Sequence, residues 1–284
     1  MGDKMKIALL IRVYDRVEDL KYNLEIIKDT WSENDYYVVV ISNGLSDGYS
    51  IDDALKPYID KLVVLESNEG HMKGSSQLLR EGIKHIPEGY NISVILEADT
   101  WLYGDHIISK YAAVLSGSDI SWASANWYDK FYSLATDFAI VKSDYLRNNP
   151  ELIQFRSFPE CYISNYMHNR GDKHINIAEN MPVHVPSYVF KYPYVHNDSR
   201  RFYAFPESKM VTHHIEWLKG GMLQKKKYFN IISQADYFED IPVKNKKWEL
   251  FKIKFWIKLS YLFPKRSWYS KRYYMKLDYM TEKK

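Results

Sequence analysis

The fold is decided first by residues 7–30, which read IALLIRVYDRVEDLKYNLEIIKDT. The run from Ile7 to Arg12 is short and almost entirely apolar, which predicts a buried strand. From Val17 to Thr30, leucine and isoleucine recur at helical spacing, which predicts a helix. This stretch is therefore a strand followed by a covering helix, the unit from which α/β sheets are built.

Three further apolar, β-branched runs continue this rhythm, at Tyr36–Ile41, Lys61–Leu65 and Ile92–Leu96. They are separated by Asp52–Tyr58 and Ser75–His85, which suit helices. Continuous apolar strands that alternate with helices predict a mostly parallel sheet covered on both faces. Further along the chain, two more strands are expected at 120–125 and 138–141, and a helix at 161–169.

Length and composition exclude several classes of protein. The 284 residues suit one α/β domain with an appendage. No apolar run approaches the roughly 18 residues that a membrane-spanning helix needs, and 46% of residues are hydrophobic, which excludes transmembrane and disordered proteins. The single cysteine, Cys161, cannot form an internal disulfide, and Ile7–Leu10 is too short and strand-like for a signal peptide. We therefore expect the protein in the cytoplasm.

The net charge of +3 is distributed unevenly along the chain. Residues 244–284 carry 13 Lys/Arg and three acids, a net charge of +10, so the residues before them carry −7. A nucleic-acid binder usually presents positive charge across its main binding face. An acidic body with a basic tail argues against that class, and we expect no nucleic-acid partner.

Polar residues follow each of the four predicted strands. Parallel sheets bind ligands beyond the carboxyl ends of their strands, so these positions are the expected crevice. The segments there are Arg12–Asp15, Ser42–Gly44, Ser67–Gly70 and Glu97–Asp99. Two carboxylates at 97 and 99 can meet a hard divalent cation, with a diphosphate supplying its other oxygens. The alternative is that these acids only cap the next helix.

Two common nucleotide signatures are missing from the sequence. No GxGxxG follows the first strand, and no GxxxxGK[ST] occurs anywhere in the chain. A dinucleotide dehydrogenase and a P-loop NTPase therefore lose their main sequence support.

The order of the strand-end motifs resembles that of the GT-A fold glycosyltransferases, especially family 2. In that family the first strand ends near P-V-Y-N, the second in D-N/D-G-S-x-D, a later turn reads N-x-G, and the fourth strand ends in D-x-D. The matching segments here are Arg12–Arg16, Val38–Asp47, Asn68–Gly70 and Glu97–Asp99. The resemblance covers about residues 5–175. It implies an α/β, GT-A-like (Rossmann-like), mostly parallel sheet flanked by helices.

The resemblance also implies roles for individual residues of the donor site. Asp99 would bind the metal ion, Mn²⁺ or Mg²⁺, and Glu97 would contact the ribose or support the metal ligand. Lys73 would meet a phosphate, although a solvated surface lysine is the simpler alternative. The base and ribose would be held by four further residues: Arg12, Tyr14, Ser42 and Asn43. For the first two of these, a loop salt bridge and a packing aromatic are the alternatives.

A later segment, Phe158–Tyr162, is similar to the family's pattern of an acid at a helix start. An inverting transferase needs a carboxylate to take the proton of the acceptor hydroxyl, and Glu160 is the candidate. The alternative is an acid that stabilises the helix dipole. Some GT-A enzymes complete the metal site with a histidine, which here would be His213 or His214. Neighbours in a strand face opposite ways, so only one of them can bind metal, and either can instead be a core or surface residue.

The basic tail, residues 244–284, contains 11 aromatic residues. Drawn as a helix, it places five apolar side chains on one stripe: Trp248, Phe251, Phe255, Leu259 and Leu262. This pattern is typical of an interfacial anchor on an anionic membrane, and the alternative is an amphipathic helix docked on its own domain. We expect a catalytic domain at 1–243, with a nucleotide-binding half at 1–115 and an acceptor half at 116–243, followed by this basic aromatic helical appendage.

The resemblance and these observations together predict a metal-dependent, inverting glycosyltransferase, with retaining chemistry, which would need no base at Glu160, as an alternative. The donor would be a nucleoside-diphosphate sugar, with UDP as the default. The acceptor would be a glycan or lipid-linked glycan, in bacterial-type surface polysaccharide assembly at the inner face of the cytoplasmic membrane. Two alternatives stay open. One is a sugar nucleotidyltransferase, and the other is a catalytically silent, membrane-bound scaffold with a transferase-like fold.

Overall fold

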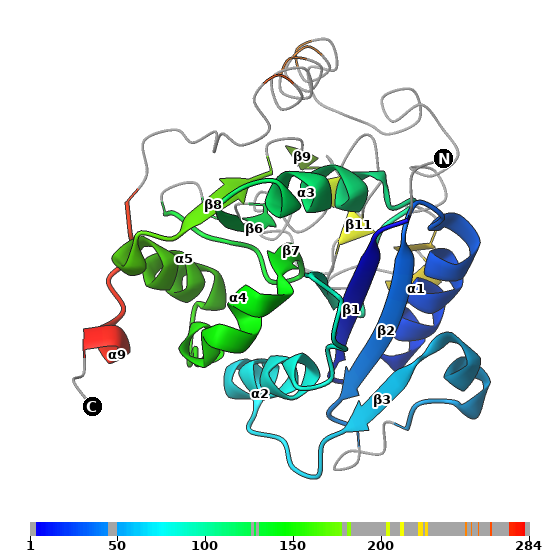
Figure 1. Cartoon of the computed structure of the whole chain (residues 1–284). Coiled ribbons are helices and arrows are strands. Elements are labelled where there is room, and N and C mark those ends of the chain that lie inside the picture. Colours follow the sequence, from blue (N-terminus) through cyan, green and yellow to red (C-terminus); the bar gives the residue numbers. More distant parts are fainter. Residues whose placement is uncertain are drawn as a thin grey trace.

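The computed structural model describes the chain at residues 4–44, 50–125, 128, 131–177 and 273–281. It also describes short pieces at 181–182, 203–204, 211–212, 221–223 and 225–226, and the single positions 248, 251, 255 and 262. A twisted sheet runs through the middle of the molecule, with helices on both sides of it (Figure 1).

The central sheet has seven strands in the order β3-β2-β1-β4-β7-β6-β8. Their bounds are β1 (Lys6–Val13), β2 (Asp35–Ser42), β3 (Lys61–Val64), β4 (Ile92–Glu97), β6 (Ile120–Ser124), β7 (Phe138–Lys142) and β8 (Lys173–Asn176). β7 runs antiparallel to both of its neighbours, and all the other neighbouring pairs are parallel. The prediction of a mostly parallel sheet is confirmed, and the expected strands lie where their apolar runs placed them.

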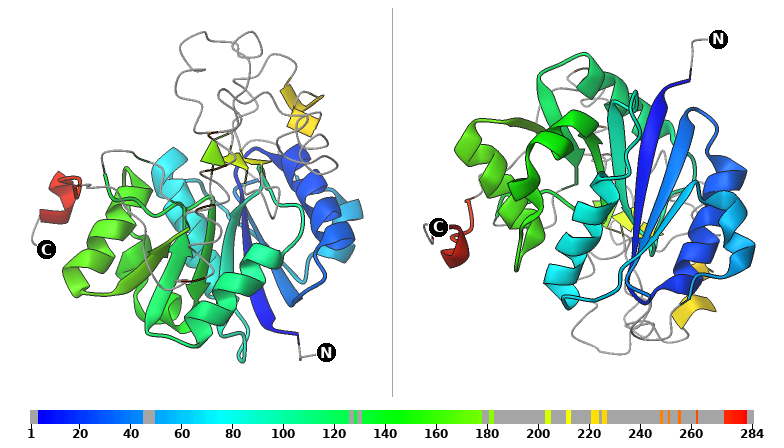
Figure 2. Two further views of the ribbon diagram at one scale, coloured as in Figure 1. Left: turned by 90° about the horizontal axis from the view of Figure 1, so that it is seen from above. Right: turned by 60° about the horizontal axis from the view of Figure 1, so that its bottom comes forward.

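The helices divide between the two faces of the sheet (Figure 2). Alternate residues of a strand face opposite sides, so Leu9 packs in one core cluster and Leu10 in the other. On the first face, the core includes side chains of α1 (Val17–Thr30) and α3 (His106–Ser116). On the second face, it includes side chains of α2 (His71–Ile83), α4 (Ser143–Asn148) and α5 (Pro159–Arg170). The sheet is therefore covered on both sides, as its apolar strands require.

Two helices differ from their predicted form. The segment expected as a helix at 52–58 is a 3₁₀ helix, η1 (Asp53–Tyr58), in which Pro57 lacks the N–H that an α-helix would use. α2 begins at His71 rather than Ser75, because Gly70 adopts φ 83° and turns the chain into the helix four residues earlier. A second 3₁₀ helix, η2 (Pro150–Ile153), links α4 to α5.

Close packing of α2 sets the position of its first turn. A Cβ atom at Gly82 would lie 2.7 Å from Ile41 Cδ1 of β2, and one at Gly74 would lie 2.8 Å from Asn68 Oδ1. Real Cβ atoms do not approach other atoms so closely, so a larger residue at either position would require the side chain of Ile41 or Asn68 to shift. The first turn of α2 therefore lies close to Asn68 and Asn43, which follow β3 and β2.

Short antiparallel pairs lie beside the main sheet. β5 (Thr100–Trp101) pairs with β11 (Val211–Thr212), and β9 (Met181–Pro182) pairs with β10 (Tyr203–Ala204). None of the helices in the described part of the chain is long and apolar enough to cross a membrane.

The end of the chain returns to the body of the protein. Residues 273–281, which include α9 (Asp278–Thr281), pack on α5 (Figure 1). The Tyr279 ring stacks on Tyr162 at 5.7 Å between centroids, and Asn165 Nδ2 donates to Met275 O at 2.6 Å. This part of the predicted appendage is therefore docked on the body.

Candidate functional site

An ion pair marks the sheet edge at which β1 and β4 end. Arg12 and Glu97 are register partners on these neighbouring strands, and Arg12 Nη2 lies 2.7 Å from Glu97 Oε1. Arg12 is 4% exposed and also donates to Thr136 O and to Ser75 Oγ. Its guanidinium is thus surrounded by partners from β4, α2 and the segment before β7, and it orients Glu97.

The turn from Glu97 to Thr100 carries the second predicted acid, Asp99. Asn23 of α1 is fully buried and its Nδ2 donates to the carbonyl oxygens of residues 97, 98 and 100. Asp99 is 8% exposed, and its carboxylate accepts no hydrogen bond from the residues that the structure describes. The turn therefore presents a carboxylate with unused acceptor capacity on a rigid backbone.

A lysine from late in the sequence reaches this turn. Lys225 is fully buried, and its Nζ lies 2.6 Å from Asp19 Oδ1 of α1 and donates to the backbone oxygen of Asp99. Burial raises the pKa of Asp19 and lowers the pKa of Lys225, while their mutual attraction opposes both shifts. Nothing in the sequence connects Lys225 to the site, and only the fold brings it there.

The candidate base stands on the first turn of α5. Phe158, at the N-cap, has φ 45° and ψ 59°, and it is the single non-glycine residue with positive φ among those described. Glu160 follows it, half-buried, and its backbone oxygen accepts from Leu134 N at 3.0 Å. Cys161 is buried, and burial together with Glu160 raises the pKa of its thiol to about 12. The thiol is therefore protonated near neutral pH.

Asp137 is a site residue that the sequence analysis did not identify. It lies just before β7, is 5% exposed, and its backbone oxygen accepts from Glu97 N at 2.8 Å. Burial raises the pKa of Asp137 well above its ordinary value, and the charges of Glu97 and Glu160 raise it further. Asp137 thus lies near both predicted acids, which are 63 positions apart in sequence.

Two of the predicted donor-binding residues lie at the carboxyl end of β2. Ser42 and Asn43 are both buried there, and neither side-chain polar atom of Asn43 has a hydrogen-bond partner among the described residues. Buried amides are almost always paired, so an unpaired one is explained most simply by a bound ligand or water. Tyr14, after β1, is 37% exposed, and Lys73 is exposed on the first turn of α2.

The two predicted histidine ligands, His213 and His214, lie outside the described residues. Thr212, the residue before them, is the register partner of Thr100, the residue after Asp99. The described chain therefore comes next to the Asp99 turn at position 212.

The described residues do not form a complete metal site. They contain no group of three or more His, Cys, Asp or Glu that could hold a metal by themselves. Mg²⁺ is often held by one or two carboxylates together with substrate phosphates. Asp99, whose carboxylate accepts no hydrogen bond from the described residues, would be the protein's carboxylate in such a site.

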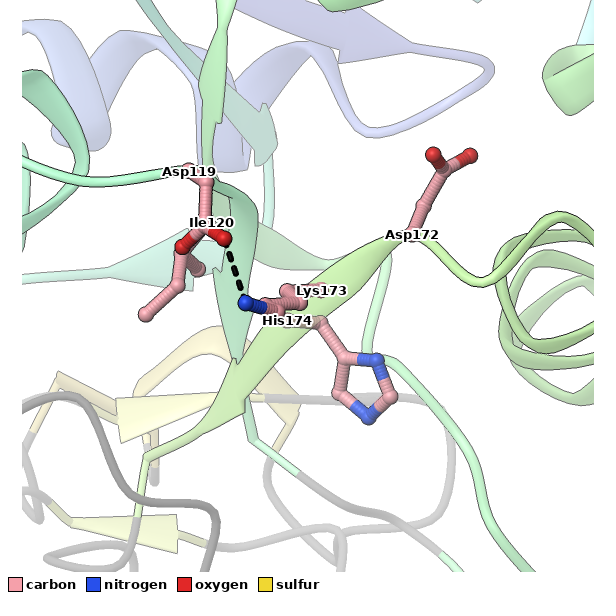
Figure 3. A pocket seen from close by; sticks show the side chains of 5 residues that line it. All are labelled: Asp119, Ile120, Asp172, Lys173 and His174. Atoms are coloured by element: carbon pink, nitrogen blue, oxygen red, sulfur yellow. Dashed lines mark hydrogen bonds and ion pairs between the residues drawn. The ribbon is translucent and has the colours of Figure 1, made fainter.

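A shallow cavity of about 460 Å³ lies elsewhere, lined by Asp119, Ile120, Asp172, Lys173 and His174 (Figure 3). Lys173 pairs with Asp119 at its rim, and burial lowers the pKa of His174 to about 4. β6 runs in the same direction as β4, and the cavity adjoins the amino ends of β6 and β8. It is therefore at the sheet edge opposite to Glu97 and Asp99.

Comparison with known proteins identifies the fold. No protein-family model and no curated protein matches the chain. The architecture is the GT-A-like α/β fold of glycosyltransferases. The mannosyltransferase PcManGT from Pyrobaculum calidifontis, solved in complex with GDP-Man and Mn²⁺, is 13% identical with a TM-score of 0.50, and the match covers 92% of this chain and 76% of that chain.

Two other solved structures match more weakly. S. aureus TarS is 13% identical with a TM-score of 0.42, over 56% of this chain and 33% of that chain, so the match spans only a third of the TarS structure. A 4-diphosphocytidyl-2C-methyl-D-erythritol synthase from Anaerococcus prevotii is 12% identical with a TM-score of 0.43, over 60% of this chain and 85% of that chain. Neither carries an argument about the function of this protein.

Proposed function

We propose that this protein is an inverting glycosyltransferase that moves a sugar from a nucleoside-diphosphate sugar to a hydroxyl group. The observation that carries the proposal is the convergence of carboxyl groups at the carboxyl end of the sheet. Asp137 interacts electrostatically with both Glu97 and Glu160, and Asp99 follows Glu97 in the same turn. Acids from β4 and from α5 therefore lie near one another at the edge where parallel sheets bind their ligands.

The carboxylates divide the chemistry between donor and acceptor. Glu160 takes the proton of the acceptor hydroxyl as its oxygen attacks the anomeric carbon from the face opposite the nucleotide. The new carbon–oxygen bond forms while the bond to the diphosphate breaks, and the diphosphate leaves with the electron pair. Asp99 is the metal ligand, with His213 or His214 as a further ligand. A bound divalent cation supplies neutralisation of the charge on the leaving diphosphate.

The remaining donor residues act by binding and orientation. Asn43 has unused hydrogen-bonding capacity, which supports its contact with the base or ribose, together with Ser42 and Tyr14. Lys73 meets a phosphate from the first turn of α2. Arg12 contributes through Glu97, because its own guanidinium is already bound by protein groups.

UDP is the default donor nucleotide in this proposal. GDP is the first alternative, since the mannosyltransferase of similar fold was solved with GDP-Man and Mn²⁺. The acceptor is a glycan or a lipid-linked glycan, and the process is bacterial-type surface polysaccharide assembly.

A thermal-shift panel of UDP-, GDP- and dTDP-sugars, each with and without Mn²⁺, tests the donor assignment. A ligand that binds only the folded state raises the unfolding midpoint by mass action. We expect one nucleotide series to raise the midpoint, and to do so more strongly with Mn²⁺. No shift with any of them would contradict the proposal and favour the silent scaffold.

Two assays with different substrates separate transfer from nucleotidyl chemistry. A glycosyltransferase releases the nucleoside diphosphate, also during slow hydrolysis without acceptor. A sugar nucleotidyltransferase instead forms a nucleotide sugar and pyrophosphate from a nucleoside triphosphate and a sugar phosphate. Release of the nucleoside diphosphate from the donor that stabilises the protein would support transfer. Formation of pyrophosphate from a nucleoside triphosphate and a sugar phosphate would support the alternative.

We also propose that the exposed part of the tail binds an anionic membrane. The structure describes four residues of the predicted stripe: Trp248, Phe251, Phe255 and Leu262. All four are helical, and their exposed fractions lie between 48% and 61%. The Trp248 and Phe251 rings stack at 5.5 Å between centroids. Exposed aromatic side chains in a segment of net charge +10 suit an anionic lipid surface. A peripheral location at the inner face of the cytoplasmic membrane follows from this proposal.

Because residues 273–281 pack on the body, membrane binding is better tested by point substitutions than by deleting the tail. Deleting all of 244–284 would also remove the residues that pack on α5, so a triple change of Trp248, Phe251 and Phe255 to serine is cleaner. The variant should lose binding to anionic liposomes while donor binding persists. Tyr279→Ser is the matched control, because its ring lies on Tyr162 and should not affect liposome binding. Unchanged binding by the triple variant would refute the anchor.

A further inference from the structure

The turn that carries Asp99 is held by two side chains from outside the central sheet. Four consecutive carbonyl oxygens, of residues 97–100, accept hydrogen bonds from side chains. Asn23 Nδ2 donates to three of them over 3.0–3.3 Å, and Lys225 Nζ donates to the fourth, that of Asp99. The backbone of the turn is therefore fixed at every residue.

The contacts of the Lys225 ammonium are with residues in or next to this turn and on α1. Its ammonium lies 2.6 Å from Asp19 Oδ1 and 4.2 Å from the centroid of the Trp101 ring, and the residue is fully buried. Trp101 belongs to β5, directly after the turn, and its Nε1 donates to Asp19 O at 3.3 Å. Asp99 also acts on Lys225 through its charge. One buried cation thus links α1, the turn and β5.

A buried ion pair is a costly way to attach a segment of chain. An apolar side chain of similar volume often packs as well or better, because it avoids the desolvation of two charges. The ammonium provides what an apolar side chain cannot, a charge-assisted hydrogen bond that fixes the carbonyl of Asp99. The arrangement is therefore explained by the geometry that it imposes on the turn.

We propose that Lys225 is a positioning residue for Asp99. By holding the backbone oxygen of the turn, it keeps the Asp99 carboxylate directed at the donor diphosphate and its metal ion. This inference rests on the proposed function and extends the donor site to a residue 126 positions away from Asp99 in sequence. Residues that orient metal ligands affect metal affinity by about 10- to 100-fold when they are changed.

The neighbouring Lys226 offers a matched control. Its Nζ lies 3.3 Å from the centroid of the Tyr22 ring and 4.0 Å from Glu18 Oε1, so it also packs a cation on α1. Among the described residues, it makes no hydrogen bond with the turn at 97–100. Lys225→Met and Lys226→Met are therefore the same substitution on adjacent residues, and only the first removes a contact with Asp99.

The experiment measures Mn²⁺ affinity rather than turnover. The full chain is titrated with Mn²⁺ in the presence of UDP or GDP, and free Mn²⁺ is followed by its electron paramagnetic resonance signal. Lys225→Met should raise the Kd for Mn²⁺ by about 10- to 100-fold, and Lys226→Met should change it by less than about twofold. Equal losses in both variants would assign the effect to docking of the segment and overturn the positioning role.

A second variant guards against loss of folding. Lys225→Met leaves Asp19 buried without its cation, whereas Asp19→Asn combined with Lys225→Met removes both charges. The double variant should keep the Mn²⁺ defect, because the bond to the Asp99 carbonyl is still missing. Normal Mn²⁺ affinity in the folded double variant would refute the positioning role of Lys225 and leave the proposed function intact. Absence of Mn²⁺-dependent nucleotide binding in the wild type would overturn the proposed function and the inference with it.

Discussion

Arg12 and Glu97 face each other as register partners at the ends of two parallel strands, with Arg12 Nη2 2.7 Å from Glu97 Oε1. The Arg12 side chain is 3% exposed and that of Glu97 is 35% exposed. The pair therefore reaches from the core to the surface at this edge of the sheet. A buried cation fixes the direction of an acid that solvent and ligand can reach.

Arg12→Met should lower the free energy of unfolding by about 2–3 kcal/mol, because it removes the guanidinium that pairs with Glu97 and donates to the backbone oxygen of Thr136. Urea unfolding followed by circular dichroism measures the change. Lys56→Met is the control, since Lys56 pairs with Asp53 on the surface and such pairs contribute about 0–1 kcal/mol. Similar small losses in both variants would show that Arg12 does not support the site.

Asp137 should make stability depend on pH in a defined direction. The pKa of Asp137 is raised in the folded protein, so the folded state binds the proton more tightly than the unfolded state does. This stability is fully present below the unfolded pKa of about 3.9, and it is lost as pH rises through the folded pKa. Asp137→Asn mimics the neutral acid and should therefore gain stability over the wild type as pH rises.

Urea unfolding at about pH 5 and about pH 8 measures this difference. The gain from Asp137→Asn should be larger at the higher pH. Asp144→Asn is the control, because Asp144 is exposed and pairs with Arg147 on the surface. If the Asp137→Asn gain is the same at both pH values, the acid is not held in its protonated form.

Phe158 has a strained backbone, with φ 45°, and 46% of its surface is exposed. Phe158→Ala and Phe158→Asn both remove the ring, but asparagine tolerates the left-handed conformation better than alanine does. The asparagine variant should be more stable by about 0.5–1 kcal/mol, as measured by thermal and urea unfolding. Equal stability of the two variants would mean that position 158 is not strained.

The strands and most helices follow from the sequence because their apolar periodicity is strong. The start of α2 does not, because Gly70 supplies the turn and no apolar repeat begins at His71. Asp137 was missed for a related reason. The apolar run at 138–141 does not reveal strand direction, and β7 is antiparallel, so its amino end lies at the crevice edge.

The long-range contacts near the candidate site cannot be predicted from a local sequence pattern. The motif order predicted that Glu97, Asp99 and Glu160 belong to one site, and that assignment stays a proposal. Lys225 meets Asp19 from 206 positions away, with no spacing rule to connect them. Local patterns encode elements, whereas contacts of this kind depend on the path of the whole chain.

The central claim is that Asp99 serves the donor while Glu160 serves the acceptor. Donor affinity, with and without Mn²⁺, and turnover are measured side by side for Asp99→Asn and Glu160→Gln. Asp99→Asn should lose the Mn²⁺-dependent part of donor binding and with it turnover. Glu160→Gln should bind the donor normally while turnover falls by about 10²- to 10⁴-fold. Near-normal turnover in Glu160→Gln, or equal loss of donor binding in both variants, would contradict this division of roles.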